Sequence, residues 1–281
     1  MSSPEEALAV AAVADAALAH DGTDPLDEQT RMTLRHHPEQ AFVALEPDGF
    51  ALLLDGRVSV VVDPVVRRNG LGSALLEQLL DEFDAGGHGG PGVLEGWSHG
   101  GHPGADRLAA LGGFEPVRSL WVMRRSLLEA LPGVPDHPGT LRSWQPADAT
   151  ELLRVNAAAF AHHPEQGAMD ATNLAERMAE PWFDPADLLV LEEDGQLLGF
   201  HWTKRHDDTE AEVYVVGVDP AQQGRGLGKV LTLAGLQHLA GRGNSRVHLY
   251  VESDNHPAVA VYSGLGFTHA AADTHVMFRR G

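Results

Sequence analysis

The segment 223–229 carries the residues best suited to hold a charged ligand. Its three glycines, Gly224, Gly226 and Gly228, let the backbone approach a bulky anion with no side chain in the way. An apolar helical run begins at Leu227, and the start of a helix presents free N–H groups and the positive end of the helix dipole. The segment therefore predicts a pyrophosphate cradle where a strand ends and a helix begins.

Two common phosphate-binding motifs do not fit this segment. The Lys-Ser/Thr ending of a Walker loop is missing, since Lys229 is followed by Val230. The dinucleotide pattern, three spaced glycines with an acidic residue about 20 positions later, does not match either. A glycine loop alone is weak evidence, so the rest of the chain has to support the interpretation.

The composition limits the classes of protein to which this chain can belong. Its 281 residues, 43% of them apolar, predict about two domains with ordinary cores. There is no cysteine, which excludes disulfides, thiolate metal sites and a cysteine nucleophile. With 20 Lys and Arg against 40 Asp and Glu, the net charge of −20 argues against nucleic-acid binding. No long apolar run or basic leader is present, so we expect a cytoplasmic monomer with no membrane partner.

The chain repeats itself once. Val62-Asp63-Pro64 and the glycine loop that follows it recur 156 residues later at Val218-Asp219-Pro220, and a Gly-Phe pair at 113–114 recurs at 266–267. The Pro- and Gly-rich stretch 131–139 reads as a linker. We therefore expect two tandem domains, residues 1–135 and 139–281.

Hydrophobic periodicity predicts a mixed α/β sheet in each copy. In the second copy we expect helices at 148–161, 172–180, 226–240 and 257–263, and strands at 188–192, 197–203, 212–218 and 247–251, with a closing strand at 276–280. The Asp194-Gly195 pair predicts a hairpin turn. The first copy is less clear, with strands at 42–45, 51–54 and 58–62 and a helix at 70–83.

The glycine loops resemble the Gln/Arg-x-x-Gly-x-Gly/Ala signature of the GNAT acetyltransferases. The second copy also resembles the family's later block, with Asn255, then Tyr262, then Leu265-Gly266-Phe267. The two signature matches are Gln223-x-x-Gly226-x-Gly228 and Arg67-x-x-Gly70-x-Gly72. The resemblance implies two tandem GNAT domains and acetyl-CoA as the co-substrate.

The second half is similar to a narrower group, the tandem GNAT enzymes of actinobacteria that acetylate the cysteinyl amine of cysteinyl-glucosaminyl-inositol. The stretches that carry this likeness are 152–160, 163–167, 198–204 and 212–220. Over the first half it rests on the architecture, the glycine loop and the pair Glu28-Gln29. The resemblance implies transfer of an acetyl group to that small-molecule amine.

Glu212 is the expected general base and Tyr262 the expected general acid. A strand alternates its side chains, so Glu212, Tyr214, Val216 and Val218 should share the face on which the acetyl group lies. The resemblance implies that Glu212 takes the amine proton, through water, and that Tyr262 protonates the departing CoA thiolate. It also implies that this strand diverges from its neighbour, freeing backbone N–H groups for the pantetheine arm and the oxyanion.

The resemblance further implies three sets of binding residues. The catalytic copy should hold the cofactor through Val216, Gly217, Val218, Gln223, Gly224, Arg225, Gly226, Leu227, Gly228, Lys229, Asn255 and Ala258. The first copy should do so through Val60, Val61, Val62, Arg68, Asn69, Gly70, Leu71, Gly72 and Ser73. The acceptor contacts should be Glu28, Glu165, Lys204, Glu212 and Tyr250. Asn255 also suits a helix N-cap, and both roles are compatible.

The first copy lacks the residues needed for proton transfer. Aligned on the repeat, Glu212 falls on Gly56, Tyr262 on Ala109 and Asn255 on His102. We therefore expect a non-catalytic domain that still holds acetyl-CoA and supports the acceptor site.

The sequence gives little support for a metal site or a hydrolase triad. The histidines at 36–37, 99, 102 and 162–163 match no metal-binding spacing, so no metal is expected. Ser98-His99 has no third partner for a hydrolase triad. A tandem GNAT enzyme for another amine and a non-catalytic acetyl-CoA-binding module both remain open.

Overall fold

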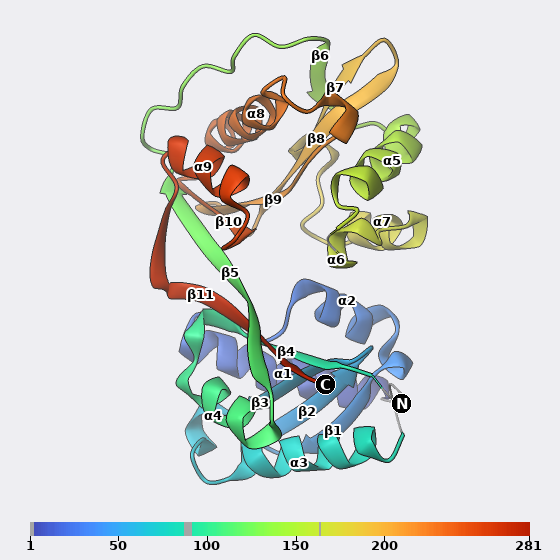
Figure 1. Cartoon of the computed structure of the whole chain (residues 1–281), viewed down its shortest axis with the longest axis vertical. Coiled ribbons are helices and arrows are strands. Elements are labelled where there is room, and N and C mark those ends of the chain that lie inside the picture. The colour runs from blue at the N-terminus through green and yellow to red at the C-terminus, as the bar shows by residue number, and fades with distance from the viewer. Residues whose placement is uncertain (1–2, 87–91, 163) are drawn as a thin grey trace. The chain divides into compact units, whose positions relative to one another are not determined.

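The chain forms two compact units in the computed structural model, which describes residues 3–86, 92–162 and 164–281 (Figure 1). Unit 1 takes the chain up to Trp121 together with Glu252–Asp254 and Ala270–Gly281. Unit 2 takes Val122–Val251 and Asn255–His269. The chain therefore passes between the units more than once, and each unit is described by itself.

Unit 1 is a small mixed sheet covered on both faces by helices (Figure 1). A meander of three antiparallel strands is extended by β4, which runs parallel to β3. The strands are β1 (Phe42–Glu46), β2 (Gly49–Leu54), β3 (Arg57–Val62) and β4 (Leu94–Ser98). The helices are α1 (Pro4–Asp21), α2 (Glu28–His36), α3 (Leu71–Asp84) and α4 (Pro103–Gly112).

Strand β2 is buried along its whole length because both of its faces are covered. Phe50 and Leu52 pack with residues of α1 and α2. Ala51 and Leu53 point the other way, into a cluster with Leu75 of α3. A central strand with two apolar faces therefore holds the two helical layers of unit 1 together.

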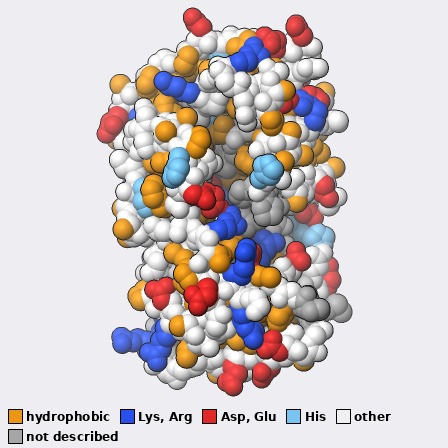
Figure 2. Space-filling model, viewed as in Figure 1, with side chains coloured by type: hydrophobic (Ala, Val, Ile, Leu, Met, Phe, Trp, Pro, Cys, Tyr) orange, Lys and Arg blue, Asp and Glu red, His pale blue; other side chains and the backbone are white. Residues whose placement is uncertain are grey.

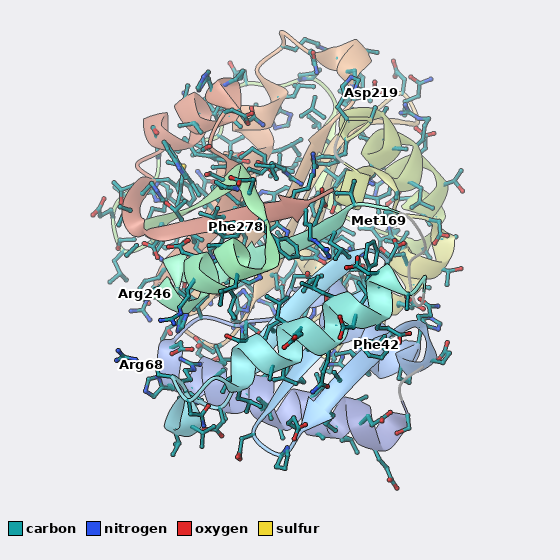
Figure 3. All side chains as sticks on the ribbon, turned by 60° about the horizontal axis from the view of Figure 1, so that its bottom comes forward. Phe42, Arg68, Met169, Asp219, Arg246 and Phe278 are labelled. Carbon is teal, nitrogen blue, oxygen red and sulfur yellow. The ribbon has the colours of Figure 1, made fainter. Side chains whose placement is uncertain are left out.

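The last strand of the chain completes the sheet of unit 1. Strand β11 (Thr268–Arg280) pairs antiparallel with β4, with Val276 opposite Ser98 and Arg280 opposite Leu94. Phe278, labelled in Figure 3, packs in the same cluster as β2. The strand expected at 276–280 is therefore confirmed, but it pairs with β4 in unit 1 rather than within the second copy.

Strand β5 (Glu115–Ser126) makes the opposite passage. It begins in unit 1, and from Val122 onward it belongs to unit 2, where Val122 and Met123 are buried. The compact units thus exchange strand segments. The division into domains 1–135 and 139–281 stays a prediction about how the chain is organised.

Unit 2 is a second mixed sheet, with the strand order β5-β10-β9-β8-β7-β6. Its remaining strands are β6 (Thr140–Ser143), β7 (Leu188–Glu193), β8 (Gln196–Arg205), β9 (Glu210–Val218) and β10 (Arg246–Glu252). Its helices are α5 (Ala149–Ala159), α6 (Pro164–Gly167), α7 (Ala171–Met178), α8 (Leu227–Gly241) and α9 (His256–Gly264). The expected α/β fold with a mixed sheet is confirmed.

Two apolar clusters cover the two faces of the unit 2 sheet. One joins Leu152 of α5 to Trp202 and Val215 of the sheet. The other joins Leu227 and Leu231 of α8 to the opposite face. Helix α8 is packed closely, since nine of its residues are buried. The helix that begins at the glycine loop is therefore anchored against the strand that precedes the loop.

Among the described helices, none combines the length and the apolar character needed to cross a membrane. On the face drawn in Figure 2, acidic side chains are dispersed among basic ones. This arrangement is that of a solvated acidic surface.

Gly235 is the position at which the packing of α8 against β8 is tightest. A Cβ atom on Gly235 would lie 2.1 Å from ring atoms of His201, which is fully buried and whose Nδ1 is 2.8 Å from the Leu231 carbonyl oxygen. We expect Gly235→Ala to lower the free energy of unfolding by about 1–3 kcal/mol, because the buried ring has no room to move.

Urea unfolding followed by tryptophan fluorescence measures this change. The matched control is Gly241→Ala on the same helix, where a Cβ meets nothing within 4 Å. The control should stay within about 0.5 kcal/mol of the parent protein. Equal effects of the two substitutions would contradict the packing argument.

Candidate active site

Strand β9 has an open edge next to β10. The parallel ladder between the two strands runs from Glu210 opposite Arg246 to Glu212 opposite His248. Past this pair, the register shows no further partners for β9 on that side among the described residues. The backbone of Val216 and Val218 is thus available to a ligand on this edge, as the expected divergence of the strands requires.

A β-bulge lies in β9 at Tyr214. The register with β8 passes from Trp202 opposite Val215 directly to Thr203 opposite Val213, and so skips Tyr214. Tyr214 and Val215 both pack on the cluster of α5, whereas Val216 packs on the cluster of α8. The prediction that Glu212, Tyr214, Val216 and Val218 share one face is therefore wrong, because the extra residue shifts the alternation by one.

Glu212 lies at the end of the ladder, buried between two neighbouring strands. Its register partners are Lys204 on β8 and His248 on β10. His206 Nε2 lies 2.9 Å from Glu212 Oε2, and His248 Nε2 lies 3.8 Å from the same oxygen. The carboxylate is 7% exposed, so its charge is balanced mainly by these side chains rather than by water.

The surroundings of Glu212 keep it ionised. Burial alone would raise the pKa of this carboxyl, but the hydrogen bond with His206 and the nearby His248 and Lys204 together lower it. The pKa of His248 is lowered as well, because burial disfavours its charged imidazolium despite the two glutamates beside it. At neutral pH, Glu212 is therefore a carboxylate able to accept a proton.

Lys204 is held against aromatic rings. Its Nζ lies 4.5 Å from the centre of the Trp182 ring and 5.3 Å from that of Tyr214. Trp202 packs edge-on against Tyr214, which also receives a hydrogen bond from Arg177. The ammonium group is thus placed by cation–π contacts on the face that carries Glu212.

Tyr250 continues the same face of β10. Its ring packs edge-on against His248, with 5.5 Å between the ring centroids, and its side chain is 44% exposed. Lys204, Glu212 and Tyr250 are therefore brought to one surface of unit 2. Glu165 lies in α6, and its side chain is outside the described part of the chain; Glu28 is the first residue of α2 in unit 1.

The cradle forms where the sequence predicts it. A short 3-10 turn at Pro220–Gln222 leads from Asp219 (Figure 3) into the glycine loop, and Gly226 caps α8 in the left-handed conformation with φ 74°. Cβ atoms built on Gly224, Gly226 or Gly228 would meet nothing within 4 Å. Backbone N–H groups from Gly224 to Gly228 have no acceptor among the described residues. This open nest of donors fits a pyrophosphate group.

Helix α9 and its N-cap carry the last three predicted residues, Asn255, Ala258 and Tyr262. Asn255 is its N-cap, and its side chain accepts a hydrogen bond from the Ala258 N–H at 3.2 Å. Burial raises the pKa of Tyr262 to about 12, and its ring packs against Phe267. Tyr262 is therefore protonated at neutral pH, as a general acid must be. The structure records no direct contact between Tyr262 and the described side chains around Glu212.

The cradle of the first copy keeps the same backbone path under strain. Arg68 adopts a left-handed φ of 69° at the position of Gly224, and its side chain extends outward (Figure 3). The Asn69 side chain accepts from the Leu71 N–H at 3.2 Å, which already satisfies one donor of the nest. Arg67 binds Asp21 at 2.6 Å and lowers the pKa of that carboxyl to about 2. At least one N–H donor of this cradle is thus already bound by a side chain of the protein itself.

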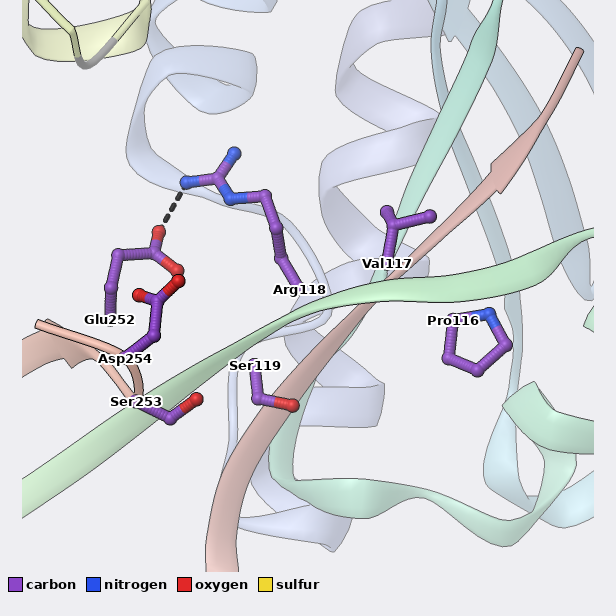
Figure 4. Close-up of a pocket in the computed structure, with 7 residues that line it drawn as sticks. All are labelled: Pro116, Val117, Arg118, Ser119, Glu252, Ser253 and Asp254. Atoms are coloured by element: carbon purple, nitrogen blue, oxygen red, sulfur yellow. Dashed lines mark hydrogen bonds and ion pairs between the residues drawn. The ribbon is translucent and has the colours of Figure 1, made fainter.

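A separate cavity of about 290 Å³ lies in unit 1 (Figure 4). It is lined by Arg118 and other residues of β5 and by Glu252, Ser253 and Asp254. Arg118 donates to Glu252 and stacks over Trp97, with its guanidinium carbon 5.4 Å from the ring centroid. None of the residues predicted to act in catalysis or binding lines this cavity.

His206 and His248 lie beside Glu212, and neither was predicted from the sequence. His248 and Tyr250 are two residues apart on a predicted strand, so their side chains lie on the same face. That alternation was the available signal. The contact between His206 and Glu212 depends on the hairpin between β8 and β9 and had no local signal.

Comparison with known proteins agrees with this geometry. The model of the acetyltransferase (GNAT) family matches residues 153–267. The chain is 59% identical to a mycothiol acetyltransferase of a Nocardioides strain, over 97% of each chain. It is 49% identical to a mycothiol acetyltransferase of Thermomonospora curvata, over 94% of this chain and 91% of that one.

Solved structures show the same fold. A GCN5-related N-acetyltransferase of Sphaerobacter thermophilus aligns over 99% of this chain and 93% of its own, with a TM-score of 0.72 and 22% identity. A tandem GNAT protein from the clavulanic acid biosynthesis pathway aligns over 99% and 96%, with a TM-score of 0.71 and 20% identity.

The chain therefore belongs to the GNAT acetyltransferase family and is an acetyl-CoA-dependent N-acetyltransferase. Its curated relatives place it, within that family, beside the mycothiol acetyltransferases. The resemblance drawn from the sequence is confirmed.

The cradle allows a direct test of the cofactor site. We expect Gly228→Glu to weaken acetyl-CoA binding by at least about tenfold, because a carboxylate would replace the open space that receives the pyrophosphate. Calorimetric titration with acetyl-CoA measures the affinity. The matched control, Gly241→Glu at the other end of α8, should bind as the parent protein does. Unchanged binding by Gly228→Glu would place the pyrophosphate elsewhere.

Proposed function

We propose that the chain transfers the acetyl group of acetyl-CoA to the cysteinyl amine of cysteinyl-glucosaminyl-inositol, which gives mycothiol in its last biosynthetic step. The observation that carries this proposal is the buried, ionised Glu212 at the end of the β9–β10 ladder, on the strand that leads into the anion cradle. The names of the relatives supply the acceptor.

Acetyl-CoA fits the residues that are present. The N–H groups of the loop 224–228 would hold its pyrophosphate, and Gln223, Arg225 and Lys229 border the same loop. The free edge of β9 at 216–218 would pair with the amide groups of the pantetheine arm, much as another strand would. The thioester would then lie past the bulge, toward Glu212.

Proton removal is the step assigned to Glu212. An α-amino group titrates near 7.7–8.0, so a part of it is already neutral at physiological pH. Glu212 takes the proton that the nitrogen loses as the C–N bond forms, directly or through one water. His206 lies within hydrogen-bonding distance and is the next group able to take that proton toward solvent.

The oxyanion and the leaving group need donors. Backbone N–H groups at 216 and 218 on the open edge of β9 are suited to the oxyanion of the tetrahedral intermediate. Tyr262, held protonated by its buried setting, returns a proton to the departing CoA thiolate. Neither group needs a metal ion.

The acceptor would lie on the face shared by Lys204, Glu212 and Tyr250. Lys204 donates to hydroxyl oxygens of the sugar or to the cysteinyl carbonyl oxygen, and its place is already set by Trp182. Glu165 and Glu28 complete the proposed contacts, since carboxylates accept from ammonium and hydroxyl groups.

The N-terminal domain, residues 1–135, is proposed to bind acetyl-CoA without transferring its acetyl group, while 139–281 performs the reaction. Gly56 and Ala109 stand where a base and an acid would be needed. Its backbone cradle at 68–73 supports cofactor binding. The monomeric state and the cytoplasmic location stay predictions.

Replacing the base tests the mechanism. With acetyl-CoA and cysteinyl-glucosaminyl-inositol, the parent protein should release CoA, and Glu212→Gln should lower kcat by about 10²–10⁴-fold because the amide accepts no proton. The affinity for acetyl-CoA should change little. CoA release measured in steady state gives kcat, and calorimetric titration with acetyl-CoA gives the affinity.

The matched control is Asp208→Asn, which removes a fully exposed carboxylate from the same hairpin and should leave kcat unchanged. Faster turnover with another amine would overturn the proposed acceptor. Acetyl-CoA binding with no turnover on any amine would instead show a binding module.

A further inference from the structure

Three metal-ligating side chains converge at the end of the β9–β10 ladder. One ligand atom each from His206, Glu212 and His248 lies within 4.8 Å of the other two. His206 Nε2 and His248 Nε2 lie 2.9 Å and 3.8 Å from Glu212 Oε2. A cation between these atoms would meet two neutral nitrogens and one carboxylate oxygen.

These separations suit a small tetrahedral cation. Zn–N and Zn–O bonds of roughly 2.0–2.1 Å put adjacent tetrahedral ligands about 3.3–3.4 Å apart. The observed 2.9 Å and 3.8 Å lie on either side of that value. Both edges to Glu212 are thus within about half an ångström of the tetrahedral value, and the third edge, between the two histidine nitrogens, is no longer than 4.8 Å.

The hydrogen bonding around His248 is typical of a histidine that binds a metal ion. Its Nδ1 lies 2.8 Å from Glu210 Oε1, and Glu210 is itself held by Arg246 at 3.1 Å. When Nδ1–H donates to this carboxylate, the lone pair on Nε2 faces Glu212. A carboxylate behind the histidine fixes the ring and raises its basicity in metal sites.

The ligands are also preorganised and reachable. Glu212 and His248 are register partners on neighbouring strands, and the His206 ring stacks on that of His248, 5.2 Å away with 22° between the planes. His206 lies in the hairpin after β8, and its side chain is 36% exposed, so an ion can enter from that side.

We propose that His206, Glu212 and His248 form a binding site for a divalent transition-metal cation, with Zn²⁺ as the best fit, and that the bound ion inhibits the acetyltransferase. The ion binds Glu212 Oε2 and withdraws electron density from the carboxylate, which is then a weaker acceptor for the amine proton. This inhibition rests on the proposed role of Glu212, whereas binding of the ion does not.

The chemistry of the ligands sets the selectivity of the site. Imidazole nitrogens suit Zn²⁺, Cu²⁺ and Ni²⁺, whereas Mg²⁺ and Ca²⁺ require mostly oxygen ligands. Lys204 on the far side of Glu212 opposes a further positive charge, so binding should be reversible. The site is therefore expected to respond to the zinc level rather than to hold a permanent ion.

Calorimetric titration of the full-length chain with zinc chloride, in the absence of acetyl-CoA, tests the binding. We expect one site of highest affinity, weakened at least about 100-fold in His248→Gln and in His206→Gln, and about 10–100-fold in Glu210→Gln, which removes only the support of His248. Mg²⁺ should give no signal at the same concentrations.

His256→Gln is the matched control, since it removes an exposed histidine from α9 outside the cluster. It should keep the parent affinity. With 16 histidines in the chain, this control separates the site from scattered surface binding. Loss of affinity in all histidine variants alike, or none in His248→Gln, would overturn the proposal.

Inhibition is measured separately from binding. Zinc should stop CoA release over the concentration range in which it binds, chelation with EDTA should restore the rate, and His248→Gln should need at least about 100-fold more zinc relative to its own uninhibited rate. Zinc binding without inhibition would leave the metal site standing and overturn the role of Glu212. Inhibition equal in the parent and in His248→Gln would overturn the site itself.

Discussion

The end of the parallel ladder between β9 and β10 is the constraint on which the site depends. Because pairing stops at Glu212 and His248, the backbone beyond them on β9 faces a ligand instead of another strand. Because pairing continues up to that point, Glu212 is buried between two strands and surrounded by Lys204, His206 and His248. A free strand edge and a buried, ionised carboxylate therefore come from a single change in strand pairing.

Comparison of the two copies shows that a glycine loop before a helix does not by itself make a catalytic domain. Both have a left-handed glycine before a helix, at Gly70 and Gly226. In the first copy, an arginine is held at a positive φ, which costs on the order of 1 kcal/mol, and Asn69 already satisfies a donor of the nest. The outline of the glycine loop is thus preserved in both copies, while Glu212 and Tyr262, the residues proposed for proton transfer, stand only in the second copy.

Much of the fold could be predicted from the sequence because its helices, loops and turns depend on residues that are adjacent in the chain. The glycines of 224–228 predicted a loop with no side chain over its backbone, the apolar run after them predicted a helix, and Asp194-Gly195 predicted the turn between β7 and β8. The repeat over 156 residues required only that like segments fold alike. These inferences depend on neighbours along the chain and on the positions of glycines, so no tertiary contact was needed.

Tertiary structure decided the features that depend on register. One skipped residue at Tyr214 reversed the alternation beyond it, and no periodicity in the sequence reveals such a bulge. The pairing of Val276–Arg280 with β4 joins segments that are far apart in the chain. The sequence does not single out this partner, because several other strands are equally apolar. The meeting of His206, Glu212 and His248 likewise arises only once β8, β9 and β10 are aligned. By itself, the sequence determined the glycine loop and the candidate base Glu212, because both can be recognised from residues adjacent in the chain. The side chains that surround Glu212 were decided by the tertiary structure, because strand register depends on how several strands pair.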